Sequence, residues 1–223
     1  MESYPPQCGG LVVVGLDWDD VPDAETASET TWGTGWVVGT YDVDAGTFTL
    51  TRPVSQEVPD GVLLPEPEDT SFPELCEDPY RGGDEDWDAT SDEAMAAQEE
   101  LTAAASALDG YITLYVSDGS SAFNVLVQGD PEAAHASLRE VWPGWLCVAQ
   151  RDAATEADLM AAQQAVMEAD LEGSMLGVGG MSGILDVTVV LADETTWNAV
   201  LDAVEPWLRP DQVRVTGMLV PVE

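Results

Sequence analysis

The chain has 223 residues, of which 45% are apolar, so it is long enough and apolar enough to bury a globular core. It carries 43 acidic residues against six basic ones, all of them arginine, and its formal charge is −37. Such a charge repels phosphate backbones and anionic lipid surfaces, which argues against nucleic acid and membranes as partners. We expect a solvated acidic surface, and the alternative is that the charge attracts a protein partner that is itself basic.

The amino-terminal stretch MESYPPQCGG has neither the basic start nor the apolar segment of an export signal, and no run of about 18 apolar residues occurs in the chain. The sequence therefore predicts a cytoplasmic protein without membrane insertion.

The three cysteines, Cys8, Cys76 and Cys147, lack CxxC spacing and predict no zinc site. Cys8 and Cys76 lie in Pro- and Gly-rich surroundings, whereas Cys147 lies in the apolar run WLCVA. A Cys8–Cys76 disulfide with a buried third thiol is the expectation if the protein is exported, and three thiols if it is cytosolic.

Residues 1–56 are predicted to form a small β-rich domain. The segments 36–43 and 47–52 are rich in Val, Thr, Tyr and Phe and flank the sequence Asp-Ala-Gly, which is typical of a β-hairpin with its glycine in the left-handed conformation. The glycines of WGTGWVVGTYD lack the lysine and the following helix of a phosphate-binding loop. We expect them to serve turns and close packing.

Residues 57–91 are predicted to form an acidic, proline-rich linker or strap, because proline disfavours regular backbone hydrogen bonding. Part of it has the alternating aspartates that open a calcium loop, but Ala89 replaces the required glycine and Met95 replaces the bidentate glutamate. An EF-hand is thus excluded. Weak candidates for a looser cation site remain in the strap, namely Asp84, Asp86 and Asp88. The DWDD turn adds three candidates of the same kind, Asp17, Asp19 and Asp20.

The second half of the chain contains an internal repeat. Residues 130–143 match residues 193–206 without a gap, and aspartate, alanine, leucine, valine and proline recur at the same places. Each copy has the pattern of helix, strand, strand, helix and strand, with Thr155 and Asp193 as helix caps in the second. We expect one αββαβ repeat over residues 92–153 and another over residues 154–223.

From residue 145 onward the expected order is βαββαβ, which is the order of a ferredoxin-like fold with its helices on one face of an antiparallel sheet. The sequence therefore predicts an α+β protein, in which a small β-rich N-terminal domain precedes two tandem ferredoxin-like repeats.

The aromatic and histidine side chains of the repeats favour packing over chemistry. Trp142 and Trp145 flank a Pro-Gly corner, and Trp207 follows a proline at the matching corner of the second copy, so we expect all three to fill the core there. The single histidine, His135, is expected on the surface of the helix over residues 131–142, with no triad partner near it in sequence. No GxSxG motif occurs.

Several segments together resemble a group of uncharacterised actinobacterial proteins, and the resemblance spans nearly the whole chain. The group shares a Trp-Asp pair, a WG-x-n-GTYDG-x-x-FT hairpin, a cysteine in a Pro/Gly strap and α/β repeats behind it. This sequence departs from the pattern by Asp-Ala-Gly at the hairpin turn and by its unusual acidity. The segments that carry the resemblance are CGG (8–10), LDWDDV and the hairpin segment (16–54), CEDPYRGGDEDW (76–87), WPGWLCV and the TEADL helix start. The resemblance implies this architecture and no activity.

These patterns provide no catalytic residue, no cofactor-binding residue and no cofactor. The sequence favours a non-enzymatic binding or interaction protein. The alternative is a hydrolase that depends on carboxylates or on a metal ion, and that uses the aspartates of the strap and of the DWDD turn.

Overall fold

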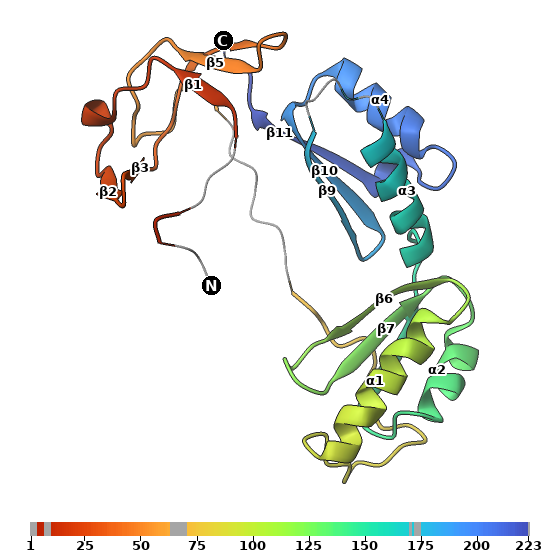
Figure 1. Ribbon diagram of the computed structural model, residues 1–223. Coiled ribbons are helices and arrows are strands. Elements are labelled where there is room, and N and C mark those ends of the chain that lie inside the picture. Colours follow the sequence, from red (N-terminus) through yellow and green to blue (C-terminus); the bar gives the residue numbers. More distant parts are fainter. Residues whose placement is uncertain (1–3, 7–9, 63–70, 170, 172–174, 223) are drawn as a thin grey trace. The chain divides into compact units, whose positions relative to one another are not determined.

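The computed structural model describes residues 4–6, 10–62, 71–169, 171 and 175–222 (Figure 1). The chain divides into two compact units. The first consists of the described parts of Met1–Glu66 and Pro221–Glu223, and the second of the described part of Pro67–Val220. The described residues form four α-helices and several small sheets, which confirms the predicted α+β class. No helix among them is long and apolar enough to cross a membrane.

The first unit contains a three-stranded sheet with the order β1-β5-β4, and a separate two-stranded ribbon. The predicted hairpin is confirmed as β4 (Gly39–Asp42) and β5 (Thr47–Leu50), with Gly46 at a φ of 63° in the turn. A Cβ at Gly39 would overlap the carbonyl oxygen of Thr49, so this glycine permits the close approach of the two strands. The other strands are β1 (Val12–Val14), β2 (Glu25–Ala27) and β3 (Thr30–Trp32).

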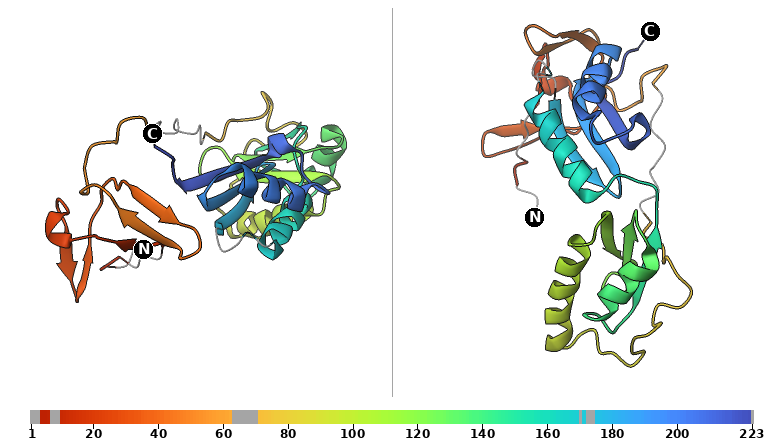
Figure 2. Two further views of the ribbon diagram at one scale, coloured as in Figure 1. Left: turned by 90° about the horizontal axis from the view of Figure 1, so that it is seen from above. Right: turned by 90° about the vertical axis from the view of Figure 1, so that its right-hand side faces the viewer.

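The second unit contains the order helix, strand, strand, helix, strand twice, and the two copies can be followed by colour from yellow-green to blue (Figure 1 and Figure 2). The first copy consists of α1 (Asp92–Ser106), β6 (Tyr111–Val116), β7 (Phe123–Val127), α2 (Pro131–Arg139) and β8 (Leu146–Gln150). The second consists of α3 (Glu156–Glu168), β9 (Met175–Met181), β10 (Ile184–Leu191), α4 (Glu194–Val204) and β11 (Val213–Leu219).

The helices begin where the sequence provides a capping side chain. The Ser91 hydroxyl accepts a hydrogen bond from the Ala94 N–H at the start of α1, and Asp193 accepts one from the Thr196 N–H at the start of α4. Each such bond satisfies a backbone donor that has no partner within the helix.

The sheets of the two copies have the same topology, and it is not that of a ferredoxin-like fold. Their orders are β6-β7-β8 and β9-β10-β11, and in each sheet the first two strands are antiparallel and the last two parallel. In the split βαβ arrangement a further strand would separate the two parallel strands. The tandem ferredoxin-like prediction is therefore not confirmed, because each helical crossover returns the chain directly beside the strand it left.

Each copy has its own core between two helices and one face of its sheet. In the first copy, Leu101 of α1 and Leu138 of α2 pack with Val125 of β7, and all three are fully buried. In the second, Val166 of α3 and Val200 of α4 pack with similar residues of β10. Figure 1 shows α1 and α2 side by side over their sheet.

The strap covers the opposite face of the first sheet. Asn124 of β7 is fully buried, and its Oδ1 accepts a hydrogen bond from the Leu75 N–H at 2.9 Å. Tyr115 donates its hydroxyl hydrogen to the Pro73 carbonyl at 2.7 Å. Because the strap adds this second cover, every residue of β7 is buried, unlike a strand with one solvated face.

A guanidinium group holds the following part of the strap. Arg139 at the end of α2 donates hydrogen bonds to the carbonyl oxygens of Pro79 at 2.8 Å, Trp142 at 3.0 Å and Gly144 at 2.6 Å. The Leu146 N–H donates to the same Pro79 carbonyl at 3.0 Å. One side chain thus joins the strap to the corner between α2 and β8.

A disulfide bond links Cys76 of the strap to Cys147 of β8, with their Cα atoms 5.5 Å apart. It corrects the expectation of a Cys8–Cys76 bridge with Cys147 as a buried thiol; Cys8 itself lies outside the described residues. The reason is that Cys147 pairs with Asn124 in the parallel register, on the face that the strap crosses. The apolar run around Cys147 conceals this position in the sequence.

The two tryptophan corners of the repeat differ. Trp142 is 1% exposed and packs edge to face on Phe123, with ring centroids 4.8 Å apart. Trp207, at the matching corner, is 39% exposed, so the expectation that it fills the core was wrong.

We therefore expect Trp142→Ala to lower the free energy of unfolding by about 3–5 kcal/mol, the usual cost of emptying a buried tryptophan site. Trp207→Ala should lower it by less, because less of that side chain leaves water on folding. Urea unfolding followed by circular dichroism measures both values. Equal losses would contradict the assigned packing.

The disulfide should stabilise the fold by about 4 kcal/mol on chain-entropy grounds, because it closes a loop with a sequence separation of 71. We expect Cys76→Ser to unfold at lower urea concentration than the native chain, and reductant to shift the native chain alone. Peptide mapping of the unreduced protein should recover residues 76 and 147 in one linked pair. Alkylation of Cys76 without reduction would be the opposing result.

Candidate functional site

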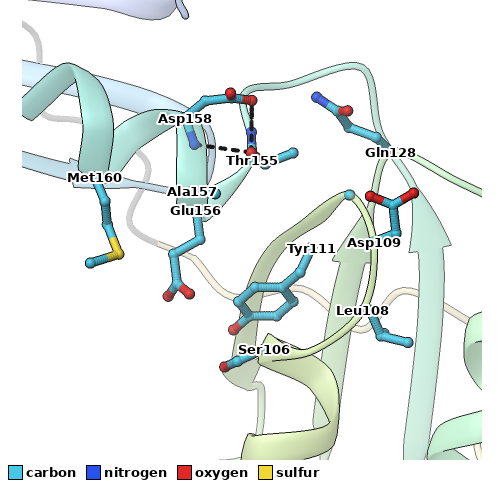
Figure 3. Close-up of a pocket in the computed structure, with 11 residues that line it drawn as sticks. Ser106, Leu108, Asp109, Tyr111, Gln128, Thr155, Glu156, Ala157, Asp158 and Met160 are labelled. Carbon is cyan, nitrogen blue, oxygen red and sulfur yellow. Dashed lines mark hydrogen bonds between the residues drawn. The ribbon is translucent and has the colours of Figure 1, made fainter.

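A cavity of about 430 Å³ opens between the two copies of the second unit (Figure 3). The first copy provides the corner between α1 and β6, together with Gln128 after β7; the second copy provides the first turns of α3. The lining consists of Ser106, Leu108, Asp109, Gly110, Tyr111, Gln128, Thr155, Glu156, Ala157, Asp158 and Met160.

The wall of the cavity that α3 forms begins with a capping box. The Thr155 hydroxyl oxygen accepts a hydrogen bond from the Asp158 N–H at 3.1 Å, and Asp158 Oδ2 accepts one from the Thr155 N–H at 3.3 Å. The same carboxylate oxygen also accepts the Thr155 hydroxyl hydrogen at 2.7 Å, as Figure 3 shows. This reciprocal arrangement fixes the entry of the chain into α3 and thereby places Glu156 beside the cavity.

The opposite wall is a tight corner. Gly110 has a φ of 73°, a conformation that a residue with a Cβ adopts only at a cost, and its carbonyl accepts a hydrogen bond from the Gln128 N–H at 2.8 Å. The Gln128 side chain donates to the Ala153 carbonyl at 2.7 Å, in the link between the copies. These bonds tie the end of β7 to both sides of the cavity.

Tyr111 contributes a neutral phenol. The residue is 8% exposed, and burial raises the pKa of its hydroxyl, with the negative charge of Glu156 raising it further. Figure 3 shows the Tyr111 hydroxyl and the Glu156 carboxylate directed into the same space, near Ser106. Tyr111 keeps its proton at neutral pH, as an ordinary tyrosine does, and the raised pKa extends this to more alkaline solutions, so the hydroxyl can act as a hydrogen-bond donor.

The charge of the lining has one sign. Asp109, Glu156 and Asp158 provide carboxylates, and the described lining contains neither arginine nor histidine. Hydroxyl and amide groups of Tyr111 and Gln128 add neutral hydrogen-bonding atoms. Such a set of groups can bind a cation that also donates hydrogen bonds.

The aspartates singled out from the sequence lie elsewhere and cap turns. Asp84 Oδ1 accepts the Asp86 N–H at 2.9 Å, and Asp88 Oδ1 accepts the N–H and the hydroxyl of Thr90 at 2.9 and 2.7 Å. The hydrogen bonds from Thr90 lower the pKa of Asp88. Across the described ranges, no three His, Cys, Asp or Glu side chains gather so that they could share a metal ion.

The DWDD turn belongs to the first unit. Asp17 Oδ1 accepts the Asp19 N–H at 3.0 Å, which caps the short 3-10 helix Trp18–Asp20. Asp17 and Asp20 also line a hollow of about 270 Å³ beside Arg52. The two acidic clusters therefore occupy different units of the chain.

His135 is buried at 8% exposure, which corrects the expectation of a surface position. Its Nε2 lies 3.4 Å from a guanidinium nitrogen of Arg139, against the strap. Burial lowers the pKa of His135, and the charges of Arg139 and Arg81 add to the effect while Glu132 and Asp78 oppose it. The group is thus held neutral within the arginine anchor of the strap.

The cavity residues were missed from the sequence, although two local signals were present. The Asp-Gly pair before β6 marks a turn, and Thr155 with Asp158 marks a helix start. Each signal describes its own segment, and neither indicates that the two segments face each other.

A scan against protein-family models and a search of curated proteins both find no match for this chain.

Removing the charge of Glu156 should lower the pKa of Tyr111, because that charge acts together with burial to keep the phenol protonated. In Glu156→Gln, the phenolate absorbance of Tyr111 should therefore appear at lower pH than in the native chain. Subtracting the titration of Tyr111→Phe isolates this signal from the other tyrosines.

Glu194→Gln is the matched control, since Glu194 holds the same first position in α4 and lines no part of the cavity. It should leave the titration unchanged. An unaltered Tyr111 titration in Glu156→Gln would contradict the assigned proximity.

Proposed function

We propose that this protein binds a cationic group of a partner in the cavity between α1, β6 and α3, and that it does so without catalysing a reaction. We also propose that the chain is related to the uncharacterised actinobacterial group that its sequence resembles. This relationship implies no activity.

One observation carries the proposal, namely three carboxylates around a cavity of about 430 Å³ whose described lining has no positive charge. A cation entering this space meets attraction from several sides, in surroundings where protein atoms have replaced part of the water that screens charge. The neutral phenol of Tyr111 and the amide of Gln128 add hydrogen-bonding groups that favour an ammonium or guanidinium group over a bare ion.

The charge of the whole chain supports the same kind of partner. A formal charge of −37 attracts cationic molecules over distances longer than a direct contact and raises their rate of encounter. It does so for any cation, however, so specificity must come from the cavity and its carboxylates.

The hydrolase alternative has less support from the positions of its residues. It relies on the aspartates of the strap and of the DWDD turn, and Asp17, Asp84 and Asp88 each accept backbone hydrogen bonds in turns. The described cavity lining contains neither a histidine nor a cysteine that could act as base or nucleophile.

N-acetyl-arginine amide is a suitable probe, because it carries one guanidinium group and no other charge. We expect saturable binding at near-physiological salt by calorimetry, and a roughly fivefold weaker affinity in Glu156→Gln, which corresponds to about 1 kcal/mol for a lost charge contact. The neutral analogue N-acetyl-glutamine amide should not bind.

Glu194→Gln again serves as the control, since it removes one negative charge from the equivalent helix position outside the cavity. Its affinity for the probe should equal that of the native chain. Equal weakening by both variants would mean that only net charge attracts the probe, and would reject the cavity as the site.

A further inference from the structure

We infer that the cation cavity continues along α3 into an apolar groove, and that the combined site binds an extended segment of a partner protein in which a basic and an apolar residue stand two positions apart. This inference rests on the proposed function and specifies the partner of the same site.

A second cavity of about 190 Å³ adjoins the first. Glu156 and Met160 line both cavities, and β6 provides Tyr111 to the first and Ile112 to the second. Leu159 of α3 and Met181 at the end of β9 complete the apolar part of the second. The acidic and apolar surfaces therefore meet along one stretch of α3.

The shared helix sets the spacing between the two kinds of surface. Glu156, Met160 and Gln163 stand at positions i, i+4 and i+7, which places them in one stripe along α3. A rise of about 1.5 Å per residue separates the levels of Glu156 and Met160 by about 6 Å along the helix axis.

An extended peptide matches this distance with alternate residues. Side chains two positions apart project from the same face and are separated by about 6.6 Å, whereas neighbouring side chains project from opposite faces. A basic side chain directed at Glu156 would thus bring the side chain two residues away to Met160. The adjacent side chain would point away from α3.

The two methionines favour an apolar contact. Met160 is 65% exposed and Met181 is 63% exposed, although both border a cavity. Methionine is flexible and polarisable, and adapts to apolar side chains of different shapes. A polyamine would leave this surface in water, and an apolar segment without a charge would leave the carboxylates unmatched. A segment that combines both features complements both surfaces.

Tripeptides of equal length and charge test the spacing. We would compare acetyl-Arg-Ser-Leu-amide with acetyl-Arg-Leu-Ser-amide, in which the arginine and leucine are adjacent, and with acetyl-Arg-Ser-Ser-amide, which lacks the leucine. The reversed acetyl-Leu-Ser-Arg-amide covers the other chain direction. We expect one of the two spaced peptides to bind about tenfold more tightly than the leucine-free peptide, and the adjacent peptide to gain less than twofold.

Met160→Ser should remove the tenfold gain, which is the ratio of the affinities for the spaced peptide and for acetyl-Arg-Ser-Ser-amide measured in the same variant. Met167→Ser is the matched control, because Met167 is also an exposed methionine of α3 but lines neither cavity. It should preserve the gain.

The outcomes separate the two proposals. Binding of the leucine-free peptide that depends on Glu156, with no further gain from a spaced leucine, would overturn the groove and retain the cation site. An equal effect of Met160→Ser and Met167→Ser would also overturn the groove. Failure of every arginine probe to bind would overturn the cation site and the groove together.

Discussion

The buried amide of Asn124 is the constraint on which the first copy of the repeat depends. It lies on the central strand of its sheet with no exposure, so each of its hydrogen-bonding atoms needs a protein partner. Its nitrogen donates to the Ser117 hydroxyl at 3.1 Å and to the Ala122 carbonyl at 2.8 Å, and its oxygen accepts the Leu75 N–H. The strap is thus part of the fold, and the disulfide and Arg139 secure a segment that the amide already positions.

The second copy has a different pair of residues at the position that corresponds to Asn124. Asn124 pairs across the parallel strands with Cys147, and Asp186 pairs in the corresponding way with Arg214 at an N–O distance of 3.1 Å. Both side chains of that ion pair are about half exposed, at 49% and 46%. The next outward position of β10 is Thr188, which is exposed, whereas the corresponding residue of β7 is Leu126, which is buried. These two polar positions are stable in water without a strap to cover them.

Local features were readable from the sequence, and long-range pairings were not. Thr155 and Asp193 were recognisable as helix caps because a cap acts within one turn of its own residue. The order of elements alone does not tell whether the two strands joined by a helix lie side by side or are separated by another strand. The ferredoxin-like prediction assumed the second arrangement, and the sheets have the first. The partner of Cys147 was hidden for the same reason, since the strap reaches it across a large sequence separation.

The candidate site depends on both αββαβ copies and cannot be reduced to a helix end. Acidic residues in a first helical turn are favourable by about 0.3–1 kcal/mol whatever they bind, and α1 and α4 have them as well. What distinguishes α3 is that its first turn faces the α1–β6 corner of the other copy, which adds Asp109 and the neutral Tyr111. The Arg151 N–H donates to the Val127 carbonyl at 2.9 Å and Gln128 donates to the Ala153 carbonyl, so the short link between the copies is held by β7. Neither copy alone contains the site, because its acidic walls come from both.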